Sequence, residues 1–501
     1  MPSKVILIPI DSRPVTFSFP QLVAETAGLE AFTPPLAIMG SLHVPADINQ
    51  LRAWLEKSLA DVKPDALFVC LDSLLYGGLV ASRRSGDSLA EVLERVKAIE
   101  DWKKLTDGKV QIFAQSSIMR IPHYNTSTTE PPYWLKCGEK IFEWSVLKYK
   151  QKIGMSAKES DLSALEEQIP QSALDDFVRR RERNFQVNEN LIEMAKSGLI
   201  DYLAFSQDDT GEYGLNVWEK TQLLEKAKTI GAANVIAYPG TDETILALMA
   251  RALIKASPAG PRISVQFSPD EGRRVVSNFE GQTIGASILA IANVIGLDIS
   301  SAAPKSGDDF TVIIHTSGGG KQGDHLNVAA NADLNTAKAV ENTVRLLEKA
   351  PVPTVLCDVA YSNGADPLLV QALFKRKELL EKLCGYGGWN TTNNTVGSAL
   401  ALGVASWYAK VNGTASENVF KRALFVRFAD DWAYQVNVRG KLAGEASDER
   451  LDQLMTPFLQ QLTKALDFDP GAIALRLPWK RTFEIEIGLR PLETACSSGK
   501  N

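Results

Sequence analysis

The chain has 501 residues, of which 45% are hydrophobic and 23% are charged, a composition typical of a folded globular protein that excludes an extended disordered chain. Its formal net charge of −6 argues against a basic surface for nucleic acid, so we expect no nucleic-acid partner. The five cysteines are odd in number and widely scattered, which favours reduced thiols over a disulfide framework or a zinc site, and no cofactor is predicted.

The chain begins with the short apolar run Val5–Ile10, which is followed directly by Asp11. The run is too short and too soon interrupted for a signal peptide or a membrane span. We therefore expect a cytoplasmic protein without a membrane partner, unless a leader has been removed. Oligomeric state is left open.

A repeating unit follows, in which a short β-rich apolar run precedes a longer segment with helical periodicity. The runs, in chain order, are Val5–Ile10, Ala66–Leu71, Val110–Ala114, Tyr202–Phe205, Val235–Tyr238, Ile263–Phe267, Val312–His315, Val355–Val359 and Leu383–Tyr386. This alternation indicates parallel strands joined by crossover helices. Nine runs predict an α/β fold of the (β/α)8 TIM-barrel type, with one run in an insertion, because a doubly wound open sheet usually uses fewer strands.

The predicted barrel covers residues 1–400, and residues 401–501 are predicted to form a C-terminal α/β appendage. Residues 122–161 are longer than a normal connection in such a fold and include Trp134, Phe142 and Trp144. These aromatic side chains have two interpretations, as platforms for carbohydrate or as the private core of a helical hairpin, and the second is the more common.

The adjacent pair Asp208 and Asp209 directly follows the run Tyr202–Phe205. Neighbouring side chains point to opposite sides of an extended backbone, so the two carboxylates can take different roles, and their repulsion separates their pKa values. One then acts as an acid while the other stays charged. The structural alternative is that either residue caps the following helix or turn.

Polar residues also follow the other runs, and the carboxyl ends of parallel strands are where α/β proteins build their sites. The acidic, amide and aromatic groups suit a neutral polyhydroxylated ligand, so the predicted partner is a carbohydrate. Each group has a structural alternative. Asp11 and Arg13 can form an internal ion pair, and Asp242 with Glu243 can be first-turn helix residues. We interpret the histidines His123 and His315 and the pair Asp430-Asp431 as structural, and the glycines and asparagines around Trp389 as equally suited to shaping a bend.

Five motifs support a resemblance over essentially the whole chain. They are Pro9–Pro14, Asp208-Asp209, Pro239–Glu243, Gly388–Thr391 with Asn394-Thr395, and Arg427–Trp432. With them the chain resembles a bacterial family of roughly 500-residue proteins catalogued as a domain of unknown function. That resemblance implies a family and no reaction.

A second, local resemblance rests on the acidic pair at a mid-barrel strand end, which is similar to that of barrel enzymes that remove N-acetylhexosamines by substrate-assisted catalysis. It implies that Asp208 holds the acetamido N–H and that Asp209 protonates the leaving oxygen, with no metal. Because Glu commonly follows the Asp in those enzymes, Glu212 or Glu243 remains open as the acid. The resemblance further implies that Tyr213 or Tyr386 holds the acetamido oxygen and that the other substrate-binding groups are Asp11, Arg13, Asp72, Trp389, Asn390 and Asn394.

Two other functions are compatible with the same residues. The first is a divalent-metal hydrolase that uses the strand-end residues Asp11, Asp72, Asp208, Asp209, Asp242 and Asp358, although no His-x-His or His-Glu-x-x-His spacing is present. The second is a non-catalytic carbohydrate-binding protein, which needs the aromatic and amide groups and no paired acid.

Overall fold

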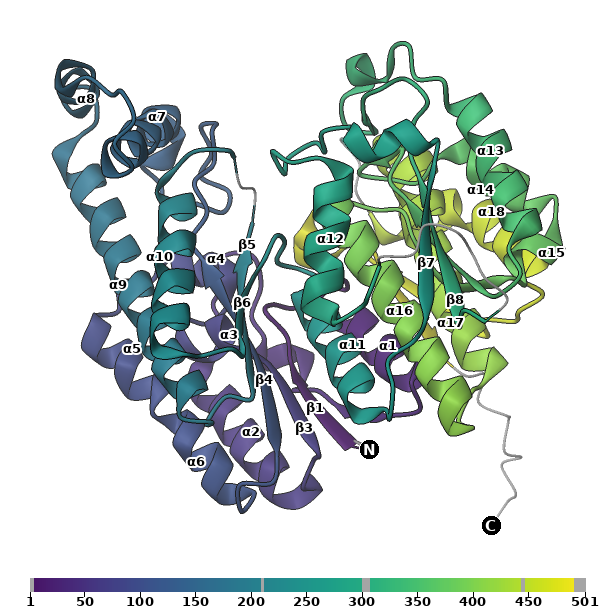
Figure 1. The fold of residues 1–501 in the computed structure, drawn as a ribbon, viewed down its shortest axis with the longest axis horizontal. Coiled ribbons are helices and arrows are strands. Elements are labelled where there is room, and N and C mark those ends of the chain that lie inside the picture. Colours follow the sequence, from purple (N-terminus) through teal and green to yellow (C-terminus); the bar gives the residue numbers. More distant parts are fainter. Residues whose placement is uncertain (1–3, 209–210, 300–306, 443–446, 491–501) are drawn as a thin grey trace.

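The computed structural model describes residues 4–208, 211–299, 307–442 and 447–490 of the chain. Two parallel sheets organise the molecule, each with its own helices (Figure 1). The first sheet has the strand order β2-β1-β3-β4-β5-β6 and the second the order β12-β10-β8-β7. We call these two halves the first lobe and the second lobe.

The strands of the first sheet are β1 (Lys4–Ile8), β2 (Glu30–Phe32), β3 (Ala66–Cys70), β4 (Gln111–Ile118), β5 (Tyr202–Gln207) and β6 (Val235–Tyr238). Those of the second sheet are β7 (Ile263–Ser268), β8 (Phe310–His315), β10 (Thr354–Asp358) and β12 (Leu383–Gly387). Each of the nine predicted runs corresponds to one of these strands, and only the three-residue strand β2 was not predicted. The α/β class with parallel strands is therefore confirmed.

The prediction of a single closed barrel is wrong. No pairing joins the two sheets in the described residues, so the first sheet ends at β2 and β6 and the second ends at β7 and β12. The reason is helix α11 (Thr244–Ala256), which contacts strands β3, β4 and β5 on one side and helices α12 and α16 on the other. Nine of its thirteen residues are buried, so it separates the sheets instead of covering an outer face.

The helices of the first lobe include α2 (Ile48–Val62), α3 (Leu71–Leu75), α4 (Leu79–Arg84), α5 (Leu89–Val96), α6 (Ala98–Leu105), α9 (Gln171–Lys196) and α10 (Leu215–Ile230). Around the second sheet lie α1 (Ser18–Thr26), α12 (Ile284–Ile295), α13 (Thr336–Lys349), α14 (Pro367–Phe374), α15 (Lys377–Leu380), α16 (Thr392–Asn412), α17 (Glu417–Phe428) and α18 (Asp448–Leu466). Helix α1 belongs to this group because its buried residues share a core with those of α16 and α17.

The aromatic segment forms helices α7 (Trp134–Lys152) and α8 (Glu159–Glu166), at one end of the first lobe (Figure 1). Trp134 and Trp144 are buried against Phe177 of α9, with ring centroids 5.5 and 6.4 Å from that of Phe177. These three side chains belong to a small core of their own. Trp134 and Trp144 therefore form the core of a helical unit, as the second interpretation predicted. Neither ring is exposed as a platform for carbohydrate.

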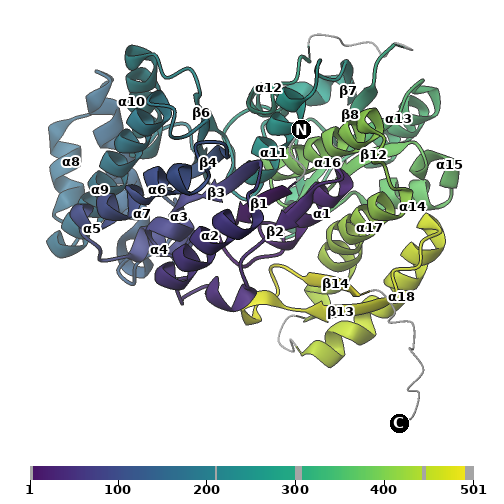
Figure 2. The same cartoon turned by 90° about the horizontal axis from the view of Figure 1, so that it is seen from below.

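The C-terminal residues belong partly to the second lobe, since the predicted boundary at residue 400 falls inside α16. After α17 comes a π-helix at Ala429–Val438, and after α18 a hairpin of strands β13 (Ala472–Arg476) and β14 (Glu486–Arg490). Figure 2 shows this hairpin beside the N-terminal part of the first lobe. Its connecting loop therefore reaches residues that precede it by more than 450 positions, as the bond between Trp479 and Ser12 shows.

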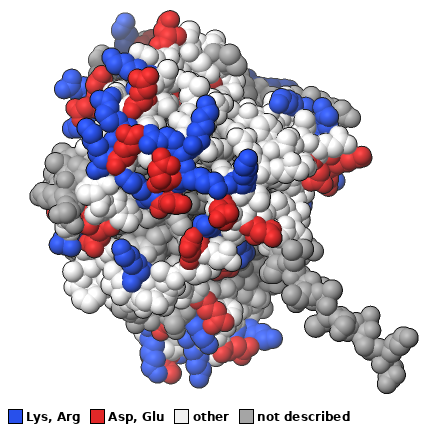
Figure 3. Space-filling model, turned by 90° about the vertical axis from the view of Figure 1, so that its right-hand side faces the viewer, with Lys and Arg blue, Asp and Glu red and all other residues white. Residues whose placement is uncertain are grey.

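The surface carries charges of both signs. On the face in Figure 3, lysine and arginine side chains lie beside aspartate and glutamate side chains. Within the described parts of the chain, every helix is too short or too polar to cross a lipid bilayer.

Candidate functional site

A cavity of about 230 Å³ lies at the carboxyl ends of β5 and β6, and we call it the first cavity. Residues from both lobes line it, because the loops after β7 and β12 close it from the second lobe. The polar groups that face it include Asp208, Asp242, Glu243, Glu280, Asn390 and Asn394. The strand-end rule thus brings together five residues named from the sequence, and Glu280 joins them from another part of the chain.

Asp208 follows the last residue of β5 and is held by two arginines. Its Oδ2 atom accepts hydrogen bonds from Arg83 Nη2 at 2.7 Å and from Arg120 Nη1 at 3.3 Å. Burial raises the pKa of Asp208, but the positive charges of Arg120 and Arg83 outweigh it and lower the pKa below its usual range. Asp208 is therefore a carboxylate at neutral pH. Its neighbour Asp209, the predicted acid, lies outside the described residues.

Glu243 lies directly before helix α11 and is buried. Burial raises its pKa to about 8, and repulsion from Asp242 and Glu280 adds to the effect. The local sequence makes this position possible, because a Cβ atom at residue 240 would lie 2.0 Å from Glu243 Oε1 and only glycine avoids that overlap. Near neutral pH, Glu243 therefore carries a proton.

Glu280 is the functional group that the sequence did not indicate. It lies in the loop between β7 and α12, where it accepts hydrogen bonds from the backbone N–H of Asn393 at 2.6 Å and from Ser287 Oγ at 3.0 Å. Burial raises its pKa to about 7. Because Glu280 lies twelve residues beyond the end of β7, a search at strand ends has no signal for it.

Several buried polar atoms around the first cavity have no hydrogen-bond partner within the described parts of the chain. They are Thr241 Oγ1, Glu243 Oε1, Asn393 Oδ1 and Asn394 Nδ2. Buried polar groups in folded proteins are normally paired, and each exception needs an explanation. A polar ligand in the cavity supplies one.

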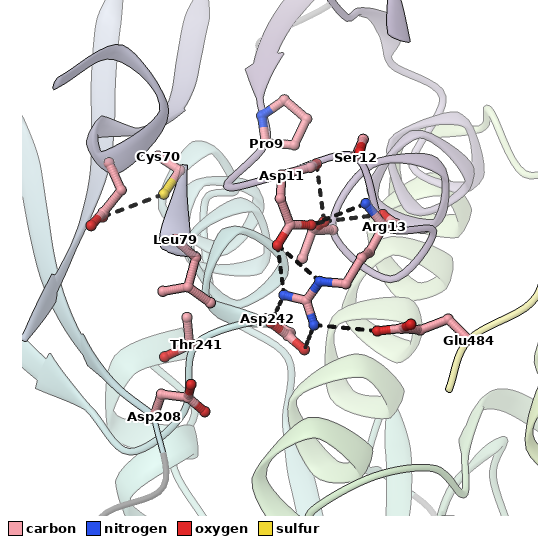
Figure 4. A network of polar contacts seen from close by, with 12 residues as sticks. Pro9, Asp11, Ser12, Arg13, Cys70, Leu79, Asp208, Thr241, Asp242 and Glu484 are labelled. Carbon is pink, nitrogen blue, oxygen red and sulfur yellow. Dashed lines mark hydrogen bonds and ion pairs between the residues drawn. The ribbon is translucent and has the colours of Figure 1, made fainter. Parts of the chain in front are cut away.

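Arg13 connects the first cavity to strand β1 (Figure 4). Its guanidinium binds Asp242 through two hydrogen bonds of 2.9 and 2.5 Å, and its Nε atom donates to Asp11 Oδ2 at 2.8 Å. Glu484, from the C-terminal hairpin loop, lies 3.6 Å from Arg13 Nη1. The other oxygen of Asp11 accepts from Thr16 Oγ1 at 2.7 Å. Asp11 and Arg13 thus form the internal ion pair that we gave as their structural alternative. The polar atoms of both side chains are bound by other groups of the protein.

Three other predicted residues do not line the first cavity. Asp72 is buried in α3, where its Oδ2 atom accepts a hydrogen bond from the backbone N–H of Ser117 at 2.9 Å, and burial raises its pKa. Tyr386 stacks on Phe428 with ring centroids 4.1 Å apart in the core of the second lobe. Tyr213 lies beside Tyr149, with ring centroids 5.8 Å apart.

Trp389 is also core and not an open wall, since it is 1% exposed and packs on Phe483 with ring centroids 5.8 Å apart. Its neighbour Asn390 does line the first cavity and has a positive φ of 67°, which lets the chain turn there. Asp431 fixes this loop, because it accepts a hydrogen bond from the backbone N–H of Gly388 at 2.7 Å and pairs with Arg427. Asp431 thus has the structural role that we predicted for the second acidic pair.

His315, and Asp358 of the predicted metal-binding set, do not line the first cavity. His315 is buried in the second sheet, where Nε2 lies 3.1 Å from Asp366 Oδ2 and Nδ1 lies 2.7 Å from Thr343 Oγ1. Asp358 accepts a hydrogen bond from the backbone N–H of Asp366 at 2.7 Å, and burial raises its pKa to about 7. Among the residues that the structure describes, no three or more His, Cys, Asp or Glu side chains are grouped so that they could hold a metal ion.

Comparison with known proteins identifies the family of the chain. The model of a family described as "Protein of unknown function (DUF4127)" matches residues 5–488, which is nearly the whole chain and agrees with the resemblance noted from the motifs. No curated protein and no solved structure matches the chain.

Proposed function

We propose that this chain, which belongs to the DUF4127 family of proteins of unknown function, is a glycoside hydrolase. The observation that supports the proposal is that one cavity joins a carboxylate whose pKa is lowered with carboxyl groups whose pKa values are raised. Asp208 is the charged group, with a lowered pKa, while the pKa values of Glu243 and Glu280 are raised to about 8 and about 7. Titratable groups whose surroundings push their pKa values apart are a mark of acid and base roles.

Glu243 is the proposed proton donor. As the bond between the anomeric carbon and the leaving oxygen breaks, the proton of Glu243 moves to that oxygen. The resulting Glu243 carboxylate then accepts a proton from the water that attacks the anomeric carbon, which restores the acid. Asp209, the donor that the sequence favoured, is the alternative for this role.

Asp208 is proposed to stabilise the positive charge that develops in the sugar. In an N-acetylhexosamine, the 2-acetamido oxygen attacks the anomeric carbon, and the cyclic intermediate carries a positive charge that a nearby carboxylate stabilises. Water then opens this ring, so the product retains the configuration of the substrate. The unpaired atoms Asn393 Oδ1 and Asn394 Nδ2 support this substrate, because they offer an acceptor and a donor to an amide and to hydroxyl groups.

The size of the cavity favours a single sugar unit. Its volume of about 230 Å³ is smaller than the roughly 300–1,000 Å³ of pockets that hold drug-sized ligands. We therefore propose a β-linked N-acetylhexosamine, either GlcNAc or GalNAc, as the unit that is bound and released.

Hydrolysis of a panel of nitrophenyl glycosides, which includes the β-N-acetylglucosaminide and the β-N-acetylgalactosaminide, tests the proposal. We expect release from an acetamido sugar that survives EDTA, and a loss of roughly 10²- to 10⁴-fold in the variant Glu243→Gln. The matched control is Glu271→Gln, which makes the same change at an exposed position outside the cavity and should keep full activity.

Two results would contradict the proposal. The first is that no glycoside of the panel is hydrolysed, and the second is that hydrolysis requires a divalent metal. If Glu243→Gln retains full activity while Asp209→Asn is inactive, the reaction stands but its proton donor is Asp209.

A further inference from the structure

A second cavity, of about 150 Å³, lies on the other side of the Asp11–Arg13 ion pair. Residues from the loop before α2, from α4 and from the C-terminal hairpin loop line it, among them Asp11, His43, Leu79, Arg84 and Trp479. Asp11 belongs to its lining and Asp242 to that of the first cavity, and Arg13 binds both carboxylates. A single guanidinium group therefore bridges the carboxylates of the two cavities, so the two cavities are neighbours.

Trp479 provides the aromatic wall of the second cavity. Its indole Nε1 donates a hydrogen bond to Ser12 Oγ at 2.8 Å, and the guanidinium carbons of Arg13 and Arg481 lie 5.5 and 4.7 Å from its ring centroid. These contacts fix the ring, which is only half-buried. The backbone of Trp479 has a φ of +56°, a conformation that bulky residues rarely adopt and that is concentrated at ligand sites.

Arg84 provides a positive charge at the same cavity. Its Nη1 atom lies 3.1 Å from the ring atom Nδ1 of His43, and among the described residues it makes no ion pair. The preceding residue, Arg83, is different, since it is buried and pairs with both Glu130 and Asp208. The nearby carboxylate of Asp11 is paired with Arg13, which it shares with Asp242. A guanidinium in this position suits the carboxylate of a ligand.

We propose that the second cavity binds an acidic sugar unit of the same substrate, next to the unit that is cleaved. The indole of Trp479 stacks on the apolar face of this sugar, and Arg84 binds its carboxylate. The proposal rests on the proposed function, because it assigns the neighbouring unit of the substrate of the first cavity. It makes the substrate a glycan in which an N-acetylhexosamine is linked to a uronic acid.

Calorimetric titration with methyl β-glucuronide, and with methyl β-glucoside as its neutral counterpart, tests this subsite without catalysis. For the wild type we expect the glucuronide to bind with a Kd on the order of 1 mM and the glucoside to bind more weakly. Arg84→Gln should weaken glucuronide binding about tenfold and leave glucoside binding unchanged, because a charge-assisted bond contributes about that much. Trp479→Ala should weaken the binding of both sugars.

The controls separate this proposal from the others. Arg345→Gln makes the same change on an exposed part of α13 and should have no effect on binding. Trp479→Phe retains a stacking ring and should bind better than Trp479→Ala if the alanine variant is folded, as its thermal melting would show. Equal binding of the two sugars, binding that is unchanged in Arg84→Gln, or no binding of the glucuronide would overturn the subsite. Glucuronide binding that depends on Arg84 in a protein without glycosidase activity would keep the subsite and reject the proposed reaction.

Discussion

The first cavity and the core of the second lobe both contain carboxyl groups with raised pKa values, but they use them differently. Burial raises the pKa of Glu243 to about 8 at the cavity, and it raises those of Asp358 and Asp430 to about 7 in the core. Glu243 faces a space that a ligand can enter, whereas neither Asp358 nor Asp430 lines any of the cavities described here. A perturbed pKa therefore indicates a functional site only where a cavity accompanies it.

The largest expected effect separates these two kinds of carboxyl group directly. Glu243→Gln and Asp358→Asn each replace a buried acid with a raised pKa by its amide. We expect the first to reduce kcat by roughly 10²- to 10⁴-fold and the second to leave it close to the wild-type value. Turnover of the nitrophenyl acetamido sugar by the two purified variants measures the difference. Equal losses in both would show that the raised pKa values have the same, structural, origin.

The next effect concerns stability in the core. Asp431→Ala removes the partner of the buried Arg427 and the acceptor for the backbone N–H of Gly388. An uncompensated buried charge costs about 3–5 kcal/mol, so the free energy of unfolding should fall by that amount. Urea denaturation followed by circular dichroism measures it, with the exposed substitution Asp270→Ala as the control. A loss below about 1 kcal/mol would mean that Asp430 takes over the pairing.

A smaller effect is the pH dependence of the first cavity. Because Glu243 must be protonated to act as an acid, kcat should fall about tenfold per pH unit above its pKa of about 8. Its pKa is raised in the folded protein, so the folded state binds more protons than the unfolded state between the ordinary value of 4.5 and about 8. The contribution of Glu243 to stability is thus lost as the pH rises through this window. Glu243→Gln should remove this slope from denaturation curves recorded at several pH values.

Much of the fold was predictable from local patterns. Apolar runs with polar ends correspond to nine strands, because buried parallel strands have that composition in any α/β protein. Closure of the sheet was not predictable, since barrels and open sheets share the same alternation of strand and helix. The deciding element is α11, whose burial between the two sheets shows in the sequence only as an apolar helix, a character that it shares with α12 and α14.

The site was predictable to the extent that it lies at strand ends. Asp208, Glu243, Asn390 and Asn394 line the first cavity as that rule implies. The prediction that Trp389 forms a wall of the site was wrong, because an aromatic residue after a strand packs in the core of a protein as often as it lines a cavity. Glu280 and Trp479 were missed because long loops bring them to the site, and no local pattern encodes a contact between residues 12 and 479.

The contacts of the C-terminal hairpin also affect the order in which the protein is built. Ser12, Arg13 and Ser18 leave the ribosome more than 450 residues before their partners Trp479, Glu484 and Glu486. Contacts between such distant parts of a chain form late and slowly. The strands of the first lobe can therefore pair during synthesis, but Arg13 meets Glu484, and the second cavity receives its aromatic wall, only after the C-terminal hairpin has also been made.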